Sequence, residues 1–410
     1  MILSYDYKSS YPFILCTFDG FPISSFVRYG DIESQKEFNK LLKEKCCLFR
    51  IHFNHLRIKP FNPITCISIS KIIGKADIKI RDNGRLVEGY SINLTCNEID
   101  LKMIFENYDV LEGYKITDLY VAKKGKLPDS IRYGVFDLFK EKCELEKHKK
   151  EPDGQYNYDK FKNLLNACFG MSLTDVVHGE VIVQDIENLQ DKEKLWKEEP
   201  KDTQTELDKY FRSWNSFLYY PWGLWVTTYG RYRLTQLIRC CYDNGNGTPY
   251  YWDTDSCKGV GWNMEKLKQL NDETIKILEN ENMIVTIDGK NYYLGIAELD
   301  CEMKFFKSLG AKKYCYVDKN NELHITIAGV NKSLGVKELK DINNFNIDFT
   351  FTESGGQCAK YNDEPIHTLT FGGVSFETAS NIAIVPTTYK LNSCDDYLSR
   401  TNFTILERRD

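Results

Sequence analysis

Two carboxylates separated by one residue, Asp253 and Asp255, are the pair in this sequence best suited to chemistry. They follow the turn-forming run Asn244-Gly245-Asn246-Gly247 and the strand-like run Tyr250-Tyr251-Trp252. Because alternate side chains of a strand share a face, both carboxylates can point into one site. Magnesium is usually held by one or two carboxylates together with substrate phosphates. On its own, however, an Asp-x-Asp pair is more often a solvated turn.

Another carboxylate, Asp6, ends the strand-like run Ile2-Leu3-Ser4-Tyr5. A carboxylate on a second strand would complete a site for two metal ions with the Asp-x-Asp pair. Tyr11 follows closely enough to pack beneath a sugar, and Pro12 ends the segment. Without partners, this run is more typical of an ordinary exit from a strand.

A polar helical face is expected in residues 157–171, which follow the turn residues Pro152-Asp153-Gly154. At 3.6 residues per turn, Lys162, Asn166 and the pair Phe169-Gly170 follow one face. Lysine can neutralise triphosphate charge, asparagine can hydrogen-bond, and glycine lets a base approach the backbone closely. Read alone, the pattern is more often an amphipathic helix with a solvated lysine.

Taken together and in this order, the three blocks resemble the polymerase motifs of family B DNA polymerases. Residues 6–12 match DxxSxYP, residues 162–170 match KxxxNxxYG, and residues 251–256 match YxDTDS. The departures from the usual residues are few and remove no metal ligand: Ser10, Ala167 and Phe169.

Two further blocks resemble the protein-primed branch of that family, which is found in phages and linear plasmids. Residues 227–231 are similar to its TxxGR motif, and residues 312–314 are similar to its KxY motif. Five blocks in the family order extend over most of the chain, which chance does not readily supply.

The resemblance implies a role for each matching residue. Asp6 and Asp255 would be the principal ligands of two Mg²⁺ ions, with Asp253 close by and Mn²⁺ as a substitute metal. Tyr11, next to Ser10, would exclude a 2′-hydroxyl and so favour deoxynucleotides.

The remaining roles concern the incoming nucleotide and the DNA. Lys162 would contact the triphosphate, with Lys150 as a second phosphate contact. The nascent base pair would be lined by Asn166, Phe169 and Gly170. The DNA contacts would be Thr227, Gly230 and Arg231 on the template strand and Lys312 and Tyr314 at the primer end.

The fold that the resemblance implies is an α+β right-hand polymerase with an antiparallel palm sheet, helical fingers, a β-rich insertion and a small thumb. The expected parts are palm 1–20, a β-rich insertion for priming protein and DNA 21–130, fingers 131–171, an acidic insertion 172–215, palm 216–344 and thumb 345–410.

Local patterns independently predict the elements that would position these residues. Residues 97–110 bring apolar side chains to one helical face, with Asn97 or Thr95 as the cap. Residues 45–96 are rich in Ile, Phe and Val and are punctuated by Pro and Gly, which indicates short strands and hairpins. A further helix is expected through Gln236 to Cys241.

Composition sets broad limits on the class of protein. The 410 residues carry a formal net charge of −5, which speaks against a protein that simply coats nucleic acid but permits a local basic channel. The 14 cysteines form no CxxC pair, so a reducing cytoplasm is expected. No apolar run reaches the length of a leader or a membrane span.

The expected function is therefore template-directed DNA synthesis, in protein-primed replication of a phage or mobile element. Relatives in this branch carry an exonuclease domain before the first motif, whereas this sequence begins just before Asp6. A separate chain supplying the exonuclease and the N-terminal palm is therefore expected, with a truncated remnant as the other reading. Two alternatives remain: an RNA-templated or RNA-making polymerase, and a noncatalytic subunit that binds DNA or the priming protein.

Overall fold

The computed structural model consists of two compact units, and each is considered by itself. One is built from Met1–Thr174 and Leu218–Met303, and the other from Asp175–Phe217 and Lys304–Ser393. The structure describes residues 1–30, 32, 34–174, 177, 180–183, 196–199, 201–214, 219–243, 245–361, 366–371, 374–379 and 382–391. Asn244 and parts of the acidic insertion and thumb expected at 172–215 and 345–410 lie outside these residues.

An antiparallel sheet in the first unit carries the three carboxylates of the predicted metal site. Its strands, in spatial order, are β10 (Thr248–Asp253), β11 (Ser256–Val260), β1 (Ile2–Tyr7) and β14 (Ala297–Gly310), of which β14 continues past the end of this unit. Tyr5 and Tyr7 are buried on one face of β1. Because side chains alternate along a strand, Asp6 points to the opposite face.

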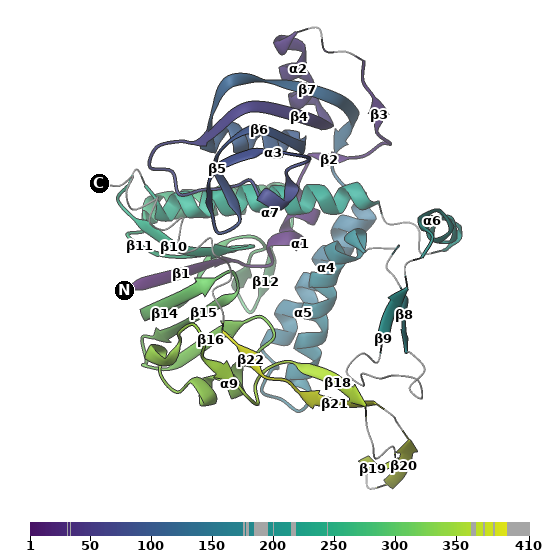
Figure 1. Ribbon diagram of the computed structural model, residues 1–410, viewed down its shortest axis with the longest axis vertical. Helices are drawn as coiled ribbons and strands as arrows, with labels where there is room; N and C mark the ends of the chain where they lie inside the picture. The colour runs from purple at the N-terminus through teal and green to yellow at the C-terminus, as the bar shows by residue number, and fades with distance from the viewer. Residues whose placement is uncertain are drawn as a thin grey trace. The chain divides into compact units, whose positions relative to one another are not determined.

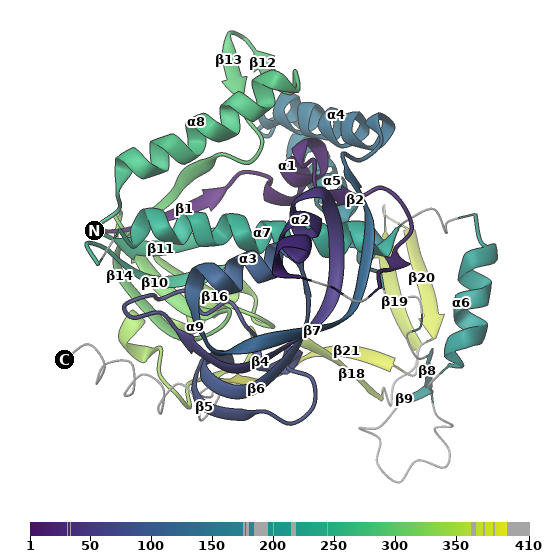
Figure 2. The ribbon, with the colours of Figure 1, turned by 90° about the horizontal axis from the view of Figure 1, so that it is seen from above.

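Two helices cover the face of the sheet that carries Tyr5 and Tyr7. They are α7 (Tyr220–Cys241) and α8 (Met264–Asn280), and both appear beside β1 in Figure 2. Their apolar side chains complete one core with the two tyrosines, including Leu234, Leu237 and Leu267. The hydroxyl of Tyr7 donates to the backbone oxygen of Arg233 at 3.0 Å, which ties β1 to α7.

A second antiparallel sheet of the first unit lies on the other side of α7 (Figure 1). Its strands, in spatial order, are β2 (Phe21–Pro22), β7 (Tyr108–Gly125), β4 (Lys45–Ile58), β6 (Arg85–Asn97) and β5 (Asp77–Asp82), with β3 (Val27–Arg28) also paired to β7. Two helices pack on it, α2 (Gln35–Glu44) and α3 (Glu98–Asn107), and a short 3₁₀ turn, Ile69–Lys71, precedes β5.

The strands of this sheet are longer than the short strands predicted for residues 45–96. β4 runs for 14 residues and β6 for 13. The Pro and Gly residues that were expected to divide the segment fall mostly in the loop after β4 and in the turn at Asn83-Gly84. Bulges in the pairing of β4 with β7 accommodate the twist of such long strands without ending them.

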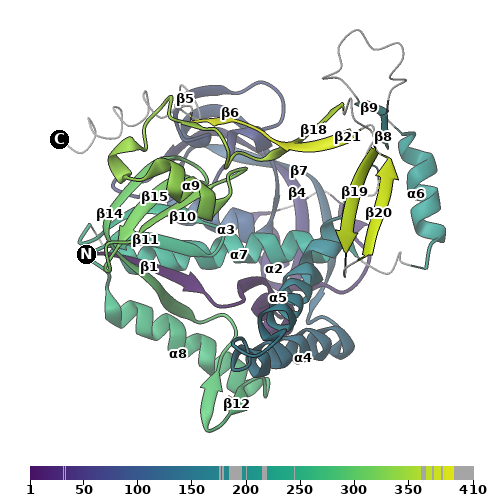
Figure 3. The same ribbon diagram turned by 90° about the horizontal axis from the view of Figure 1, so that it is seen from below.

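A helical hairpin of α4 (Asp129–Glu146) and α5 (Gly154–Gly170) belongs to the first unit (Figure 3). Helix α1 (Ser10–Thr17) and the small hairpin of β12 (Val285–Ile287) and β13 (Lys290–Tyr292) complete this unit. Helix α1 is mostly apolar, and every residue of it except Tyr11 is buried. Phe13, Phe139, Leu165 and Trp225 bring α1, α4, α5 and α7 into one core.

Three predicted helices of this unit are confirmed, although their bounds differ from the predicted ones. Helix α3 begins after Asn97, whose side chain accepts from the backbone of Ile99 and Asp100, while the Asp100 carboxylate accepts from the Asn97 backbone. This reciprocal capping box satisfies backbone donors that the first helical turn leaves free. Helix α5 begins three residues earlier than predicted, and the helix expected through Gln236 to Cys241 is the end of the much longer α7.

The second unit contains mostly β-hairpins. Its elements are β8 (Glu180–Val183), β9 (Trp196–Glu199), α6 (Thr203–Arg212), β15 (Lys313–Asp318), β16 (Leu323–Ile327), α9 (Lys332–Leu339), β17 (Thr350–Phe351), β18 (Gln357–Tyr361), β19 (Ile366–Phe371), β20 (Val374–Ala379), β21 (Ile382–Pro386) and β22 (Tyr389–Lys390). Cys315, Ile325, Phe345 and Phe351 belong to its small core. The mixture of helices and antiparallel sheets confirms the α+β prediction.

Among the described helices, none is both long and apolar enough to cross a membrane.

Candidate active site

The backbone of the first sheet brings Asp6 and Asp255 together. Asp6 pairs with Ser256 across β1 and β11, and the backbone N–H of Tyr7 donates to the backbone oxygen of Asp255 at 3.0 Å. β10 ends at Asp253, and a single turn residue, Thr254, separates Asp253 from Asp255. Thr254 adopts a left-handed φ of 54°. The tight turn therefore places Asp255 beside Asp6, with Asp253 next to it.

The environment of the two carboxyl groups disfavours a second negative charge. Burial, followed by repulsion from Asp255 and Asp300, raises the pKa of Asp6 to about 7, although Lys258 opposes the shift. Burial, followed by repulsion from Asp253, raises the pKa of Asp255. Buried like charges of this kind are stabilised by a cation.

Asp6 also has an oxygen without a partner. Its Oδ1 is buried and accepts no hydrogen bond from the described residues. Burying an unsatisfied carboxylate oxygen is costly, and a divalent cation would satisfy it. The donor set at Asp6 and Asp255 therefore fits a hard cation such as Mg²⁺.

A cavity of about 420 Å³ opens in front of Asp6 and Asp255, a volume within the usual range for small-molecule sites of roughly 300–1,000 Å³. Residues from β1, α1, α4, α5 and β14 line it. The lining residues include Asp6, Ser10, Tyr11, Lys142, Lys162, Asn166, Asp255, Glu298 and Asp300. Lys162 and Asn166 are one turn apart on α5, so the structure brings the predicted polar face of that helix to the predicted metal site.

Lys142 of α4 is a cation of this cavity that the sequence reasoning missed. Its Nζ donates to the Ser9 hydroxyl at 3.1 Å, and burial lowers the pKa of the lysine. Lys150, predicted as the second phosphate contact, is exposed between α4 and α5 and does not line the cavity. The available signal was the spacing of Lys142 from Val135 and Phe139, which puts a lysine on the buried stripe of α4.

Two acidic residues of β14 were also missed. Glu298 and Asp300 line the cavity, and Glu298 lies opposite Asp6 in the sheet. Lys8 Nζ is 3.7 Å from the Glu298 carboxylate. Their alternation in the sequence was a signal of a shared strand face, but only the pairing of β14 with β1 shows that this face meets Asp6.

The Tyr11 ring packs against Phe169 of α5, with 4.1 Å between the ring centroids and 39° between the planes. Burial, followed by the negative charge of Asp255, raises the pKa of Tyr11. Ser10 is buried and lines the cavity, whereas Phe169 and Gly170 lie at the end of α5 and are not among the lining residues.

The residues predicted to touch the template lie on α7, and their side chains make internal contacts. The Thr227 hydroxyl donates to the Leu224 oxygen at 2.9 Å. Arg231 Nη2 donates to Asp100 Oδ1 at 2.8 Å and to the Thr228 hydroxyl at 3.1 Å. The α3 capping residue Asp100 thus fixes the orientation of the Arg231 guanidinium.

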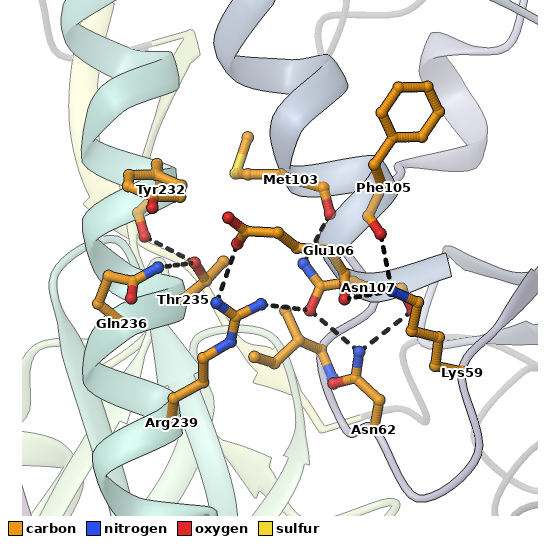
Figure 4. Close-up of polar contacts among 11 residues, drawn as sticks. Lys59, Asn62, Met103, Phe105, Glu106, Asn107, Tyr232, Thr235, Gln236 and Arg239 are labelled. Atoms are coloured by element: carbon orange, nitrogen blue, oxygen red, sulfur yellow. Dashed lines mark hydrogen bonds and ion pairs between the residues drawn. The ribbon is translucent and has the colours of Figure 1, made fainter. Parts of the chain in front are cut away.

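Polar contacts continue along α3 and α7 towards the end of α3 (Figure 4). Arg239 donates to Glu106 at 2.9 Å and to the Asn107 side chain at 3.2 Å. Asn62 donates to the same Asn107 oxygen at 3.0 Å, and Lys59 donates to the Phe105 backbone oxygen at 2.7 Å. These bonds anchor the sheet that carries α3 to the helix that carries Arg231.

Lys312 and Tyr314, predicted to meet the primer end, belong to the second unit. Lys312 has a left-handed φ of 52° between β14 and β15. The Tyr314 ring lies 5.5 Å from Phe306 and 6.5 Å from Tyr316, centroid to centroid.

A different group of metal-ligand residues lies at the β15–β16 turn. The ligand atoms of Asp318, Glu322 and His324 are within 4.8 Å of one another. However, Asp318 Oδ1 accepts from the backbone N–H groups of Asn320 and Glu322, at 2.9 Å and 2.8 Å. These bonds close the hairpin, so the turn structure accounts for this carboxylate.

No protein-family model and no curated protein matches the sequence. Solved structures do resemble the fold. Phi29 DNA polymerase in a ternary complex with primer–template DNA and incoming nucleotides superposes with a TM-score of 0.60 at 15% identity, over 95% of this chain and 58% of that chain. The same polymerase with single-stranded DNA gives 0.60 at 15% identity, over 95% and 57% of the two chains.

The chain has the fold of a DNA polymerase. An orthorhombic crystal form of phi29 DNA polymerase agrees, with a TM-score of 0.55 at 14% identity over 95% of this chain. This chain spans 58% of the length of both that form and the ternary-complex polymerase. At this level of identity the likeness concerns the fold, and the chemistry has to be argued from the site itself.

Proposed function

We propose that this chain carries out template-directed DNA synthesis, transferring deoxynucleotides to a primer 3′-hydroxyl by a two-metal mechanism. One observation carries the proposal. Segments far apart in the sequence place Asp6, Asp255 and Lys162 around a single cavity. Carboxylates for metal and a lysine for phosphate are the groups that phosphoryl transfer needs, because its catalysis is mostly positioning and charge neutralisation.

Asp6 and Asp255 would hold the metal, with Asp253 and Asp300 beside them. Bound Mg²⁺, or Mn²⁺ in its place, lowers the pKa of an attacking hydroxyl and neutralises phosphate charge. Binding and orientation of the nucleotide are assigned to side chains of the protein. Lys162 and Lys142 bind the triphosphate, with Lys142 in the role predicted for Lys150. Both line the cavity and are not fixed by an ion pair in the described residues.

Selection of the nucleotide is assigned to the residues around Tyr11. Asn166 lines the cavity one turn beyond Lys162 and can hydrogen-bond to the nucleotide. The Tyr11 ring packs against Phe169; it would close the cavity where the sugar lies and would leave no room for a 2′-hydroxyl. Thr227 and Arg231 would meet the template, and Lys312 with Tyr314 the primer end.

We further propose that synthesis is protein-primed and takes place in the cytoplasm. The five motif blocks favour the protein-primed branch of family B, and the sheet β2–β7 is the surface assigned to the priming protein and DNA. The right-hand arrangement assigns the first sheet to the palm, α4 and α5 to the fingers, and residues from 345 onwards to the thumb.

The decisive test is extension of a radiolabelled DNA primer with Mg²⁺ and deoxynucleotides. Asp6→Asn and Asp255→Asn should abolish synthesis while leaving the circular dichroism spectrum unchanged. Asp272→Asn is the matched control, because Asp272 is an exposed carboxylate of α8, and it should retain full activity. Substantial synthesis by either site variant would refute the assignment.

The second candidate function is a noncatalytic or split-gene polymerase subunit that binds DNA or the priming protein and needs a partner chain for activity. The same assay therefore has two arms, with this chain alone and with the product of the adjacent gene added. Synthesis only in the second arm favours the subunit. No synthesis in either arm favours a noncatalytic binder of DNA or the priming protein.

A further inference from the structure

We propose that Gly230 sets the position of the Tyr11 ring, and through it the selection of deoxynucleotides over ribonucleotides, instead of contacting DNA. The inference rests on the proposed function. Gly230 lies in the middle of α7, a helix of 22 residues. Glycine is unfavourable inside a helix, so a packing reason for it is expected.

The packing reason is contact with Tyr11. A β-carbon at Gly230 would lie 2.9 Å from Tyr11 Cε1 and 3.5 Å from Cδ1, with Ile14 Cδ1 at 3.6 Å. The first distance is shorter than carbon atoms tolerate, so any side chain at this position must displace the ring. The missing side chain lets α7 lie directly against Tyr11.

The Tyr11 ring has a second packing contact, with Phe169 of α5. Phe169 packs on it with 4.1 Å between the centroids. Tyr11 therefore contacts two helices, at Phe169 of α5 and at Gly230 of α7. The depth of the ring in the site is set jointly by these two contacts.

The geometry also gives the direction of the effect. Tyr11 lines the cavity, whereas none of the described residues that line it comes from α7. Helix α7 covers the sheet face that carries Tyr5 and Tyr7, and Asp6 points to the opposite face. A group added at Gly230 would therefore push the ring away from α7 and into the space assigned to the sugar.

Burial argues against the DNA contact predicted for Gly230. The residue is buried and has no side chain, and the space that a β-carbon would need is taken by Tyr11. Its neighbours Thr227 and Arg231 are partly exposed, so they are the residues of this motif that a template strand can reach.

The test measures nucleotide binding to the full chain on a dideoxy-terminated primer–template with Mg²⁺, using dATP or ATP opposite a template thymine. Gly230→Ala should weaken dATP binding about tenfold, as overpacking of a fitted site does, while primer–template affinity stays the same. Gly134→Ala is the matched control: it makes the same change at an exposed position of helix α4, where the new carbon meets nothing within 4 Å. Its dATP affinity should match that of the wild type.

A double-mutant cycle separates the contact with Tyr11 from a contact with DNA. In a Tyr11→Ala background no ring is left to displace, so Gly230→Ala should change dATP affinity by less than about twofold. ATP should bind to Tyr11→Ala whether or not Gly230→Ala is also present. If Gly230→Ala alone does not fold, the double variant should recover the melting temperature of Tyr11→Ala. Failure of that recovery would overturn the inference.

The remaining outcomes are also distinct. Three results would overturn the inference and leave the proposed function standing. They are an equal loss of dATP affinity with and without the tyrosine ring, no loss of dATP affinity in Gly230→Ala, and a loss confined to primer–template binding. A wild-type chain that binds neither nucleotide would overturn both.

Discussion

The carboxyl group of Asp6 lies close to Asp255 and Asp300 and is largely buried, which raises its pKa from 3.8 to about 7. An acid whose folded pKa is raised lowers the stability of the fold as pH increases, because the unfolded chain releases the proton first. The penalty is absent below about pH 4, grows as pH rises towards 7, and is complete above that value.

Asp6→Asn should therefore stabilise the metal-free protein at pH 8, by roughly 4 kcal/mol, and should have little effect near pH 4. Thermal melts at the two pH values measure this difference. Adding Mg²⁺ at pH 8 should raise the melting temperature of the wild type and not that of Asp6→Asn. An Asp6→Asn protein that is less stable than the wild type at pH 8 without metal would show that the carboxylate is already satisfied within the chain.

Lys142 offers a test of how the triphosphate is bound. Lys142→Met keeps most of the side-chain volume and removes the charge, so it should raise KM for deoxynucleotides by about tenfold or more, since a charge-assisted hydrogen bond contributes roughly 1.5–3 kcal/mol. Lys150→Met should leave KM unchanged, because Lys150 does not line the cavity. Steady-state primer extension measures both. The reverse ranking would restore Lys150 to its predicted role.

At the residue scale, the sequence identifies residues of local motifs and misses those that only the fold brings near. Asp6, Asp255, Lys162 and Asn166 stand in short runs with a characteristic order, so the pattern is enough to select them. Lys142, Glu298 and Asp300 belong to no such run, because their role depends on a helical hairpin and on strand pairing. The same holds for Gly230, whose contact with Tyr11 no local pattern encodes.

Helix α3 is the element that joins the second sheet to α7. Asp100 at its beginning holds Arg231, and Glu106 and Asn107 at its end hold Arg239. Lys102 lies 4.4 Å from the centroid of the Tyr232 ring between these points. Three contacts along one short helix fix its orientation on α7 more firmly than one would.

Asn107 should be the most sensitive polar residue of this junction. It is fully buried; its amide donates to the Met103 oxygen at 2.7 Å, and its oxygen accepts from Asn62 and Arg239. Asn107→Ala leaves buried partners unsatisfied and should cost about 2 kcal/mol. Urea unfolding measures this, with exposed Asn291→Ala as the control. Equal midpoints for the two variants would show that water replaces the lost bonds.

Sequence patterns predicted helices well where the caps are local and strands less well where the ends are not. Asn97 and Asp100 specify the start of α3 by themselves, because a capping box needs only neighbouring residues. The length of β4 depends on pairing with β6 and β7, which begin far away in the chain. No local pattern within β4 itself contains that pairing.

For the whole molecule, the formal net charge of −5 requires that any DNA-binding surface be local. Neutralisation of phosphates by lysine and arginine releases counterions, so affinity falls as salt rises, with a slope set by the number of phosphates contacted. Arg231 is already paired with Asp100. Its positive charge is therefore partly balanced before DNA arrives.

The salt dependence of primer–template binding should consequently distinguish two predicted DNA contacts. Lys312→Ala should reduce the slope of log affinity against log salt by about one, as loss of a single phosphate contact does. Arg231→Ala should reduce the slope by less than one, because Asp100 already balances part of the Arg231 charge and fewer counterions leave the DNA when Arg231 binds it. The variant should also lose affinity, because Asp100 is left uncompensated near the DNA. Arg231→Ala with Asp100→Asn should restore affinity lost through that uncompensated charge while leaving the slope low. Fluorescence anisotropy between 50 and 200 mM salt measures all three variants, and an unchanged slope in Lys312→Ala would remove that residue from the DNA surface.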